Sequence, residues 1–152
     1  MYIYLWRFSE NGIILAFLFE EDMGKILIAE DENLIRSSLT QALRKDGFLV
    51  VEAKDYQEAL ERLKDESFDL AVLDLYLEDG MHGLTLIKEV HRLSPAAKII
   101  VITAFGTEEI KEVAMKERID RFYDKPFEIT DIKNAVRGLL QKPEPREKSP
   151  AG

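Results

Sequence analysis

Short apolar runs alternate with amphipathic stretches between residues 25 and 140. In the stretches between the runs, apolar side chains recur every three or four positions, which is typical of helices that bury one face. The first four runs are four residues long and rich in Ile, Val and Leu, as expected of buried strands, and a short fifth strand follows them. The predicted strands cover residues 26–29, 48–51, 70–73, 99–102 and 120–123.

Five strand–helix units in succession predict an α/β protein with a parallel sheet covered by helices on both faces. Right-handed crossovers leave few arrangements of such units. We expect the flavodoxin-like (βα)5 fold, a doubly wound parallel sheet with strand order 2-1-3-4-5. Its topological switch point lies between the first and third strands, and ligands bind there beyond the carboxyl ends of the strands.

Polar residues stand where four of the predicted strands end. Glu30 and Asp31 follow the first strand, Asp74 the third, Thr103 the fourth and Lys125 the fifth. Because parallel strands end at one edge of the sheet, we expect these side chains to lie together. An acid pair, a central acid, a hydroxyl and a lysine make up a site suited to phosphoryl transfer.

Asp74 is the predicted nucleophile, since a carboxylate can attack a phosphoryl group to form an acyl phosphate. Glu30 and Asp31 could hold a Mg²⁺ ion that offsets the repulsion between Asp74 and the phosphate. Each residue also has a simpler interpretation. The acid pair could cap a helix starting near Asn33, and Lys125 could be a surface lysine before a proline. Only their combination at strand ends favours the site.

The composition of the chain limits the kinds of functional site that it can form. The chain has 152 residues, a formal net charge of −8 and no cysteine. The negative charge disfavours direct binding to nucleic acid or to an anionic membrane. Thiol catalysis and zinc–thiolate sites are excluded. Two histidines cannot form a histidine-rich metal site, so any metal is expected to be a hard cation on carboxylates.

The two ends of the chain differ from the middle. Residues 1–22 could form a β-hairpin turning at Asn11–Gly12. We favour another interpretation, in which they are not native and the natural protein begins at Met23, because residues 20–23 can be encoded by a purine-rich ribosome-binding sequence followed by a start codon. Residues 23–140 form the predicted domain. Residues 141–152 contain three prolines and no apolar period, as in a tail or severed linker.

Four motifs in order make residues 25–140 resemble a bacterial two-component response-regulator receiver domain. They are Ile28-Ala29-Glu30-Asp31, Leu73-Asp74-Leu75 with Gly80 and Gly83 after it, Val101-Ile102-Thr103-Ala104, and Asp124-Lys125-Pro126-Phe127. The intervals also fit: 43 residues from Asp31 to Asp74, 29 to Thr103 and 22 to Lys125. Residues 103–107 are similar to receivers of the nitrogen-regulator class.

The resemblance implies a role for each matching residue. Asp74 would accept a phosphoryl group, and Thr103 and Lys125 would contact its oxygens. Phe122 matches the family's aromatic switch position, and residues 107–140 its usual signalling face. The implied Mg²⁺ ligands are Glu30, Asp31, Asp74 and the backbone carbonyl of Tyr76.

The implied function is a cytoplasmic switch rather than a metabolic enzyme. A sensor histidine kinase would phosphorylate it, and its signalling face would control an output domain or effector, in transcription regulation for example, or form a homodimer. Tyr76 and Phe105 stand two residues beyond Asp74 and Thr103, where two rings could shield the acyl phosphate from water. We therefore predict a phosphate lifetime of many minutes or longer.

Three other functions compete with this one. A phosphatase or mutase of the haloacid-dehalogenase type needs a second aspartate two residues after the nucleophile, where this chain has Tyr76. A flavodoxin-like cofactor module needs a phosphate loop after the first strand, where Glu30-Asp31-Glu32 would repel phosphate. The third is a receiver-like interaction module that works without phosphorylation, against which the intact set of site residues argues.

Overall fold

The structure is a computed structural model that describes residues 2–8, 14–20, 23–78 and 80–141. Within these ranges, no helix is long and apolar enough to cross a membrane. Strands β1 (Tyr2–Phe8) and β2 (Ile14–Glu20) pair with each other in an antiparallel two-stranded sheet. The turn predicted at Asn11–Gly12 lies outside the described residues, and so does the predicted tail beyond residue 141.

The remaining five strands form one parallel sheet in the order β4-β3-β5-β6-β7. Counted from the first strand of this sheet, the order is 2-1-3-4-5, which confirms the predicted fold. The strands are β3 (Lys25–Ala29), β4 (Leu49–Ala53), β5 (Leu70–Asp74), β6 (Lys98–Thr103) and β7 (Arg121–Asp124).

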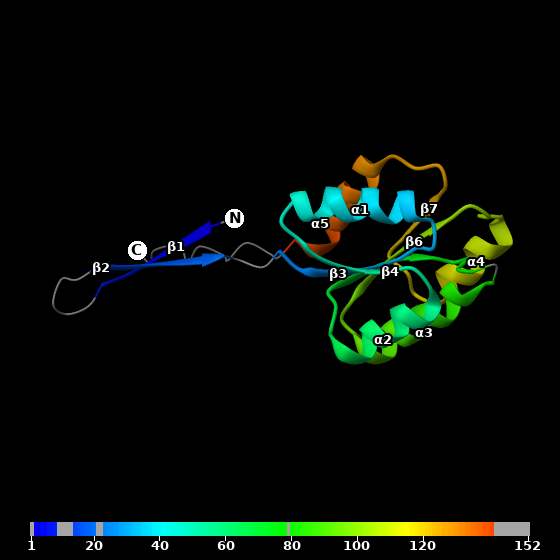
Figure 1. The fold of residues 1–152 in the computed structure, drawn as a ribbon, viewed down its shortest axis with the longest axis horizontal. Helices are drawn as coiled ribbons and strands as arrows, with labels where there is room; N and C mark the ends of the chain where they lie inside the picture. The colour runs from blue at the N-terminus through cyan, green and yellow to red at the C-terminus, as the bar shows by residue number, and fades with distance from the viewer. Residues whose placement is uncertain (1, 9–13, 21–22, 79, 142–152) are drawn as a thin grey trace, which may run out of the picture.

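Helices cover both faces of the sheet (Figure 1). On one face lie α1 (Asn33–Lys45) and α5 (Ile129–Leu140). On the other lie α2 (Tyr56–Asp65), α3 (His82–Leu93) and α4 (Glu108–Lys116). Such a double layer follows from strands that are apolar on both sides, because each side needs its own cover.

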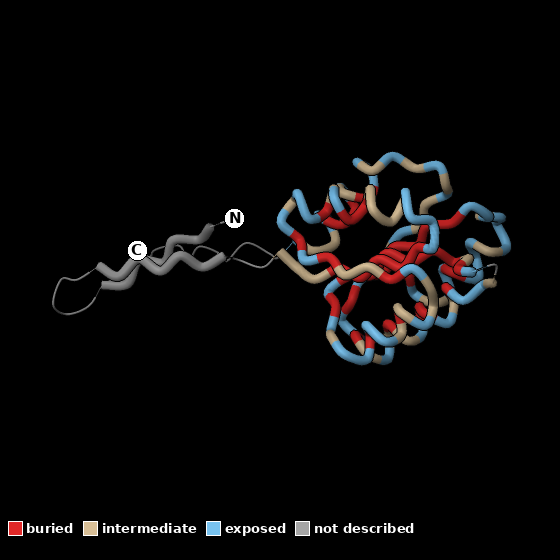
Figure 2. The backbone as a smooth tube through the Cα atoms, viewed as in Figure 1, coloured by how far each residue is buried: buried red, intermediate tan, exposed pale blue. Residues whose placement is uncertain are grey.

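Two apolar clusters, one on each face of the sheet, form the core. Ile26 and Ile28 of β3 pack toward α1 and α5, while Leu27 and Ala29 of the same strand pack toward α2 and α3. All five residues of β5 are buried, including the terminal Asp74. Figure 2 shows the buried strands at the centre and exposed backbone on the outer helices and loops. The sheet thus gives Asp74 a rigid support.

A local capping signal fixes the start of α2. Asp55 caps α2 by accepting a hydrogen bond of 2.7 Å from the backbone N–H of Glu58, and the Glu58 carboxylate accepts one from Lys54 N–H. The last strand begins one residue later than predicted, at Arg121, because Asp120 forms the corner before it. The Asp120 carboxylate and backbone N–H both bond to the backbone of Ile99.

Gly83 allows α3 to start close to the end of β5. A Cβ atom at this position would lie 2.3 Å from the backbone oxygen of Asp74 and 2.4 Å from the Cα of Leu75, well inside van der Waals contact. The backbone N–H of Gly83 donates to the carbonyl of Leu75 over 3.1 Å. The close approach of helix and strand at the predicted site therefore requires glycine here.

Candidate phosphoryl-transfer site

The predicted site residues meet at the carboxyl edge of the parallel sheet. Glu30 directly follows β3, and Asp74 and Thr103 are the last residues of β5 and β6. Lys125 directly follows β7. The neighbouring strands β3 and β5 belong to connections that run in opposite directions across the sheet, so the acidic residues lie at the topological switch point.

Three carboxylates form the centre of the site. Glu30, Asp31 and Asp74 each offer one oxygen, and these oxygens all lie within 4.8 Å of one another. Glu30 is fully buried and Asp74 is 3% exposed, whereas Asp31 is exposed. Hard divalent cations such as Mg²⁺ prefer this kind of oxygen cluster, and the exposed acid leaves an open side for them. The donor set thus fits a Mg²⁺ ion.

Lys125 bridges the two buried acids. Its Nζ atom lies 2.8 Å from Glu30 Oε2 and 2.8 Å from Asp74 Oδ2, and only 12% of its side chain is exposed. The Lys125–Pro126 peptide bond is cis, and the backbone N–H of Lys125 donates to the carbonyl of Thr103. The lysine is therefore a point charge held against the central aspartate rather than a surface lysine.

Burial controls the charge of this cluster. It raises the pKa of Glu30 to about 7 from an ordinary value of 4.5, although the hydrogen bonds from Lys125 and Glu32 oppose the rise. Burial also raises the pKa of Asp74. It would lower the pKa of Lys125, but the hydrogen bonds to Asp74 and Glu30 outweigh it and leave that pKa above its usual value. One ammonium ion does not fully offset these acids, which favours a further cation.

Backbone N–H groups orient all three carboxylates. Glu30 Oε1 accepts from Glu32 N–H at 2.9 Å, and Asp74 Oδ1 accepts from Tyr76 N–H at 3.0 Å. Asp31 Oδ2 accepts from Glu78 N–H at 3.3 Å. Glu78 has φ of +52° and donates its N–H, so a proline could supply neither this backbone angle nor this hydrogen bond.

The hydroxyl and the aromatic residues of the site come from the ends of β5, β6 and β7. Thr103 is fully buried, and its Oγ1 accepts a 3.3 Å hydrogen bond from Phe105 N–H. The rings of Tyr76 and Phe105 meet edge to face with centroids 5.0 Å apart, and Phe105 is 60% exposed. Phe122 is partly buried against the core cluster that includes Ala114. Tyr76 and Phe105 thus form a pair of rings just beyond the ends of β5 and β6.

The sequence did not predict a role for two residues at this edge of the sheet. One is Glu78, whose backbone N–H donates to the Asp31 carboxylate. Arg36, in the first turns of α1, donates to the backbone carbonyl of Glu30 at 2.8 Å. The sequence signal for Arg36 is an arginine that closely follows a helix start without a capping side chain. This signal alone is too weak to predict a contact.

A sequence model of the response regulator receiver domain matches residues 26–137. The chain belongs to the response-regulator receiver family. Receivers are signalling domains of two-component systems rather than metabolic enzymes, so the phosphatase, mutase and cofactor-module interpretations are set aside.

Curated relatives agree with this assignment. The chain is 35% identical to the two-component response regulator PhoP of Pseudomonas aeruginosa over 118 residues, which are 78% of this chain and 52% of PhoP. It is 32% identical to the receiver protein CpdR of Brucella abortus, covering 78% of this chain and 98% of CpdR. The chain thus spans about half the length of PhoP but nearly all of CpdR.

Solved receivers share the fold of this domain. A CheY-like receiver from Methanospirillum hungatei is 29% identical, with a TM-score of 0.72 over 76% of this chain and 92% of that one. A response regulator from Burkholderia pseudomallei, solved with a phosphorylated aspartic acid and a calcium ion, is 28% identical, with a TM-score of 0.69 over 76% and 68%. NtrX from Brucella abortus is 26% identical, with a TM-score of 0.71 over 78% and 27%.

Proposed function

We propose that this receiver is a phosphorylation-dependent switch whose acceptor is Asp74. One observation supports this most strongly: Lys125 Nζ is shared at 2.8 Å between Asp74 and Glu30, beside the exposed carboxylate of Asp31. A buried nucleophile, a lysine for the phosphate and a cation site are thereby assembled around one carboxylate.

The phosphoryl group comes from a phosphohistidine of a sensor kinase. An oxygen of Asp74 forms the new P–O bond as the P–N bond to the histidine breaks, and the departing imidazole takes up a proton. Glu30, Asp31, Asp74 and the carbonyl of Tyr76 would hold Mg²⁺, which neutralises charge on the transferring phosphoryl group when bound. Lys125 exchanges its contact with the Asp74 carboxylate for a phosphoryl oxygen, and the Thr103 hydroxyl donates to another.

The signal leaves the domain through residues 107–140. Helix α4 is held least firmly, since Ala114 is its one buried residue among those described. Phe105, Val113 and Met115 expose 60%, 41% and 51% of their surface at the start of α4 and along it. Movement of Thr103 toward the phosphate would draw Phe122 inward and shift these apolar side chains. Such a face suits an output domain, an effector protein or a second copy, within a cytoplasmic pathway.

Intact-mass spectrometry tests the acceptor. The protein is incubated with phosphoramidate in Mg²⁺ or in EDTA, together with Asp74→Asn and the control Asp55→Asn. Asn caps helices as well as Asp does, so the control keeps α2 and removes a carboxylate elsewhere. We expect one added phosphoryl group in wild type and control, only with Mg²⁺. Wild type that binds Mg²⁺ but gains no phosphate from several donors would favour a phosphorylation-independent module.

A further inference from the structure

Arg36 ties the start of α1 to the loop that carries two of the acids. Its Nη1 atom lies 2.8 Å from the carbonyl oxygen of Glu30 and 3.4 Å from that of Asp31. Its Nη2 atom donates to Asn33 Oδ1 at 2.9 Å. Its side chain is only 14% exposed. One guanidinium thus holds both carbonyls of the acid pair.

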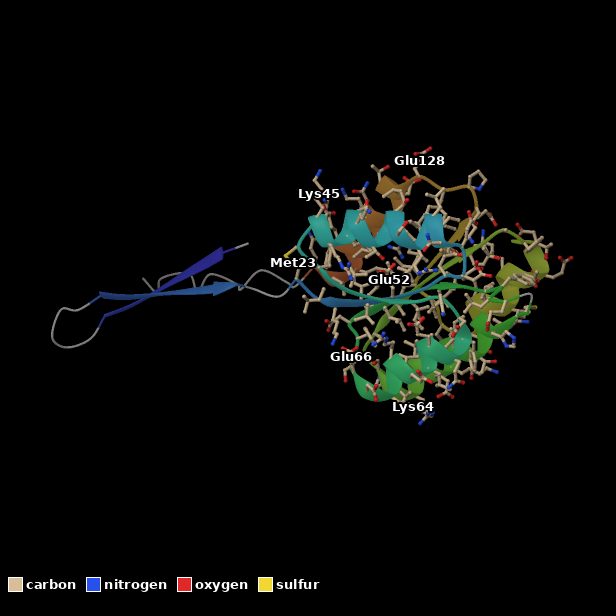
Figure 3. All side chains as sticks on the ribbon, viewed as in Figure 1. Met23, Lys45, Glu52, Lys64, Glu66 and Glu128 are labelled. Carbon is tan, nitrogen blue, oxygen red and sulfur yellow. The ribbon has the colours of Figure 1, made fainter. Side chains whose placement is uncertain are left out.

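Glu52 fixes the same arginine from the sheet. Its Oε1 atom lies 3.5 Å from Arg36 Nε. Glu52, labelled in Figure 3, belongs to the edge strand β4, which α1 covers. Backbone hydrogen bonds also hold this region. The N–H of Glu30 donates to the carbonyl of Ala53, and the N–H of Arg36 donates to the carbonyl of Glu32. The guanidinium is therefore held in place on both sides of its fork.

The acid pair needs such a support because the helix that follows it lacks a side-chain cap. Only residues 30–32 separate β3 from α1, and the N-cap residue Glu32 makes no side-chain capping bond. The side-chain N-cap that usually fixes the first turn of a helix is absent at the start of α1. Arg36 takes its place from within the helix, and the planar fork of arginine reaches several acceptors at once, which lysine cannot do.

We propose that Arg36 is a positioning residue for the metal site: by fixing the backbone of Glu30 and Asp31, it sets the affinity of the carboxylate cluster for Mg²⁺. The inference rests on one part of the proposed function, that the cluster binds a divalent cation. Phosphorylation of Asp74 is not required for it. Residues that orient metal ligands typically change metal affinity by about 10- to 100-fold when they are replaced.

Two effects of Arg36 on Mg²⁺ oppose each other, and substitutions separate them. Its positive charge repels the ion, whereas its hydrogen bonds place the ligands. Arg36→Met removes both, and Arg36→Lys keeps the charge but loses the fork. If positioning dominates, both variants bind Mg²⁺ more weakly. If charge dominates, Arg36→Met binds Mg²⁺ more tightly than wild type and Arg36→Lys is unchanged.

Arg44 provides a matched control on the same helix. Its Nη2 atom donates to the carbonyl of Val50 at 2.9 Å, so Arg44→Met also removes a bond between an α1 arginine and a backbone carbonyl, but away from the acids. Mg²⁺ binding is measured by isothermal titration calorimetry on the full chain, with thermal unfolding in EDTA for each variant. We expect a loss of affinity of about 10-fold or more for both Arg36 variants and less than 2-fold for Arg44→Met.

A rate measurement distinguishes positioning from damage to the acceptor. Phosphoramidate labelling of the Arg36 variants should need more Mg²⁺ for half-maximal rate but reach a near wild-type rate at saturation. If both variants fold poorly, Glu52→Gln should still weaken Mg²⁺ binding, to a smaller degree. Unchanged or tighter Mg²⁺ binding by Arg36→Met, or an equal loss in Arg44→Met, would overturn the proposal. If wild type binds Mg²⁺ but accepts no phosphate, the proposed function is wrong, while the role of Arg36 in Mg²⁺ binding can still be tested.

Discussion

The buried carboxylate of Glu30 should make the stability of the metal-free domain depend on pH in an unusual direction. Burial raises the pKa of Glu30 to about 7, while in the unfolded chain it should lie near the ordinary 4.5. Between these values the folded state holds a proton that the unfolded state has released. The free energy of unfolding therefore rises as the pH falls through 7, and the gain is complete near pH 4.5.

The size of the effect follows from the two pKa values. One pKa unit corresponds to about 1.4 kcal/mol, so the shift from 4.5 to about 7 amounts to roughly 3 kcal/mol. This is the cost of keeping Glu30 ionised in the fold above pH 7. Glu30→Gln avoids the cost, and we expect it to be more stable than wild type by up to roughly 3 kcal/mol at pH 8. The difference should vanish toward pH 4.5.

Urea unfolding in EDTA at several pH values between 4.5 and 8 measures both proteins. Asp74 contributes in the same direction, because burial raises its pKa too, so part of the pH dependence should remain in Glu30→Gln. Added Mg²⁺ should reduce the stability difference at pH 8 by stabilising wild type more. A difference that stays constant with pH, or a Glu30→Gln variant less stable than wild type at pH 8, would refute the reasoning.

Three other predictions concern Asp74 and its surroundings. Asp74→Asn should abolish phosphate incorporation yet melt, without Mg²⁺, at the same or a higher temperature than wild type, since removing one acid from the cluster relieves repulsion; a lower melting temperature would contradict this. Replacing Tyr76 and Phe105 together by Ala should shorten the lifetime of the acyl phosphate, followed by intact mass over time, and an unchanged lifetime would rule out shielding by the rings. Gly83→Ala should lower the free energy of unfolding in urea by about 1–3 kcal/mol, because its Cβ would meet the Asp74 backbone at 2.3 Å.

Much of this fold could be predicted from short-range patterns. Apolar runs of four residues located β3, β4, β5 and β6 of the parallel sheet, and Asp55 is of a residue type that favours the start of a helix such as α2. The bonds of Asp120 to the backbone of Ile99 moved the start of β7 by one residue. That correction depends on a contact between residues far apart in sequence, which no local pattern records.

The site residues also divide into those that the sequence could predict and those that it could not. Glu30, Asp74 and Lys125 could be brought together in advance because parallel strands end at one edge of a sheet. The supports of the acids could not, since Arg36 and Glu78 act through backbone groups whose positions depend on loop conformation. The positive φ of Glu78 in particular could not be predicted, because a glutamate does not indicate this backbone angle. The sequence therefore predicted which side chains meet at this edge of the sheet and left out the residues that orient them.

The location of the phosphate tests the central claim most directly. Wild-type protein labelled by phosphoramidate in Mg²⁺ is reduced with borohydride, which converts an aspartyl phosphate to homoserine, and the peptides are mapped by tandem mass spectrometry. We predict homoserine at residue 74 and unmodified aspartate at residue 31. Homoserine at another aspartate, with residue 74 unchanged, would contradict the account.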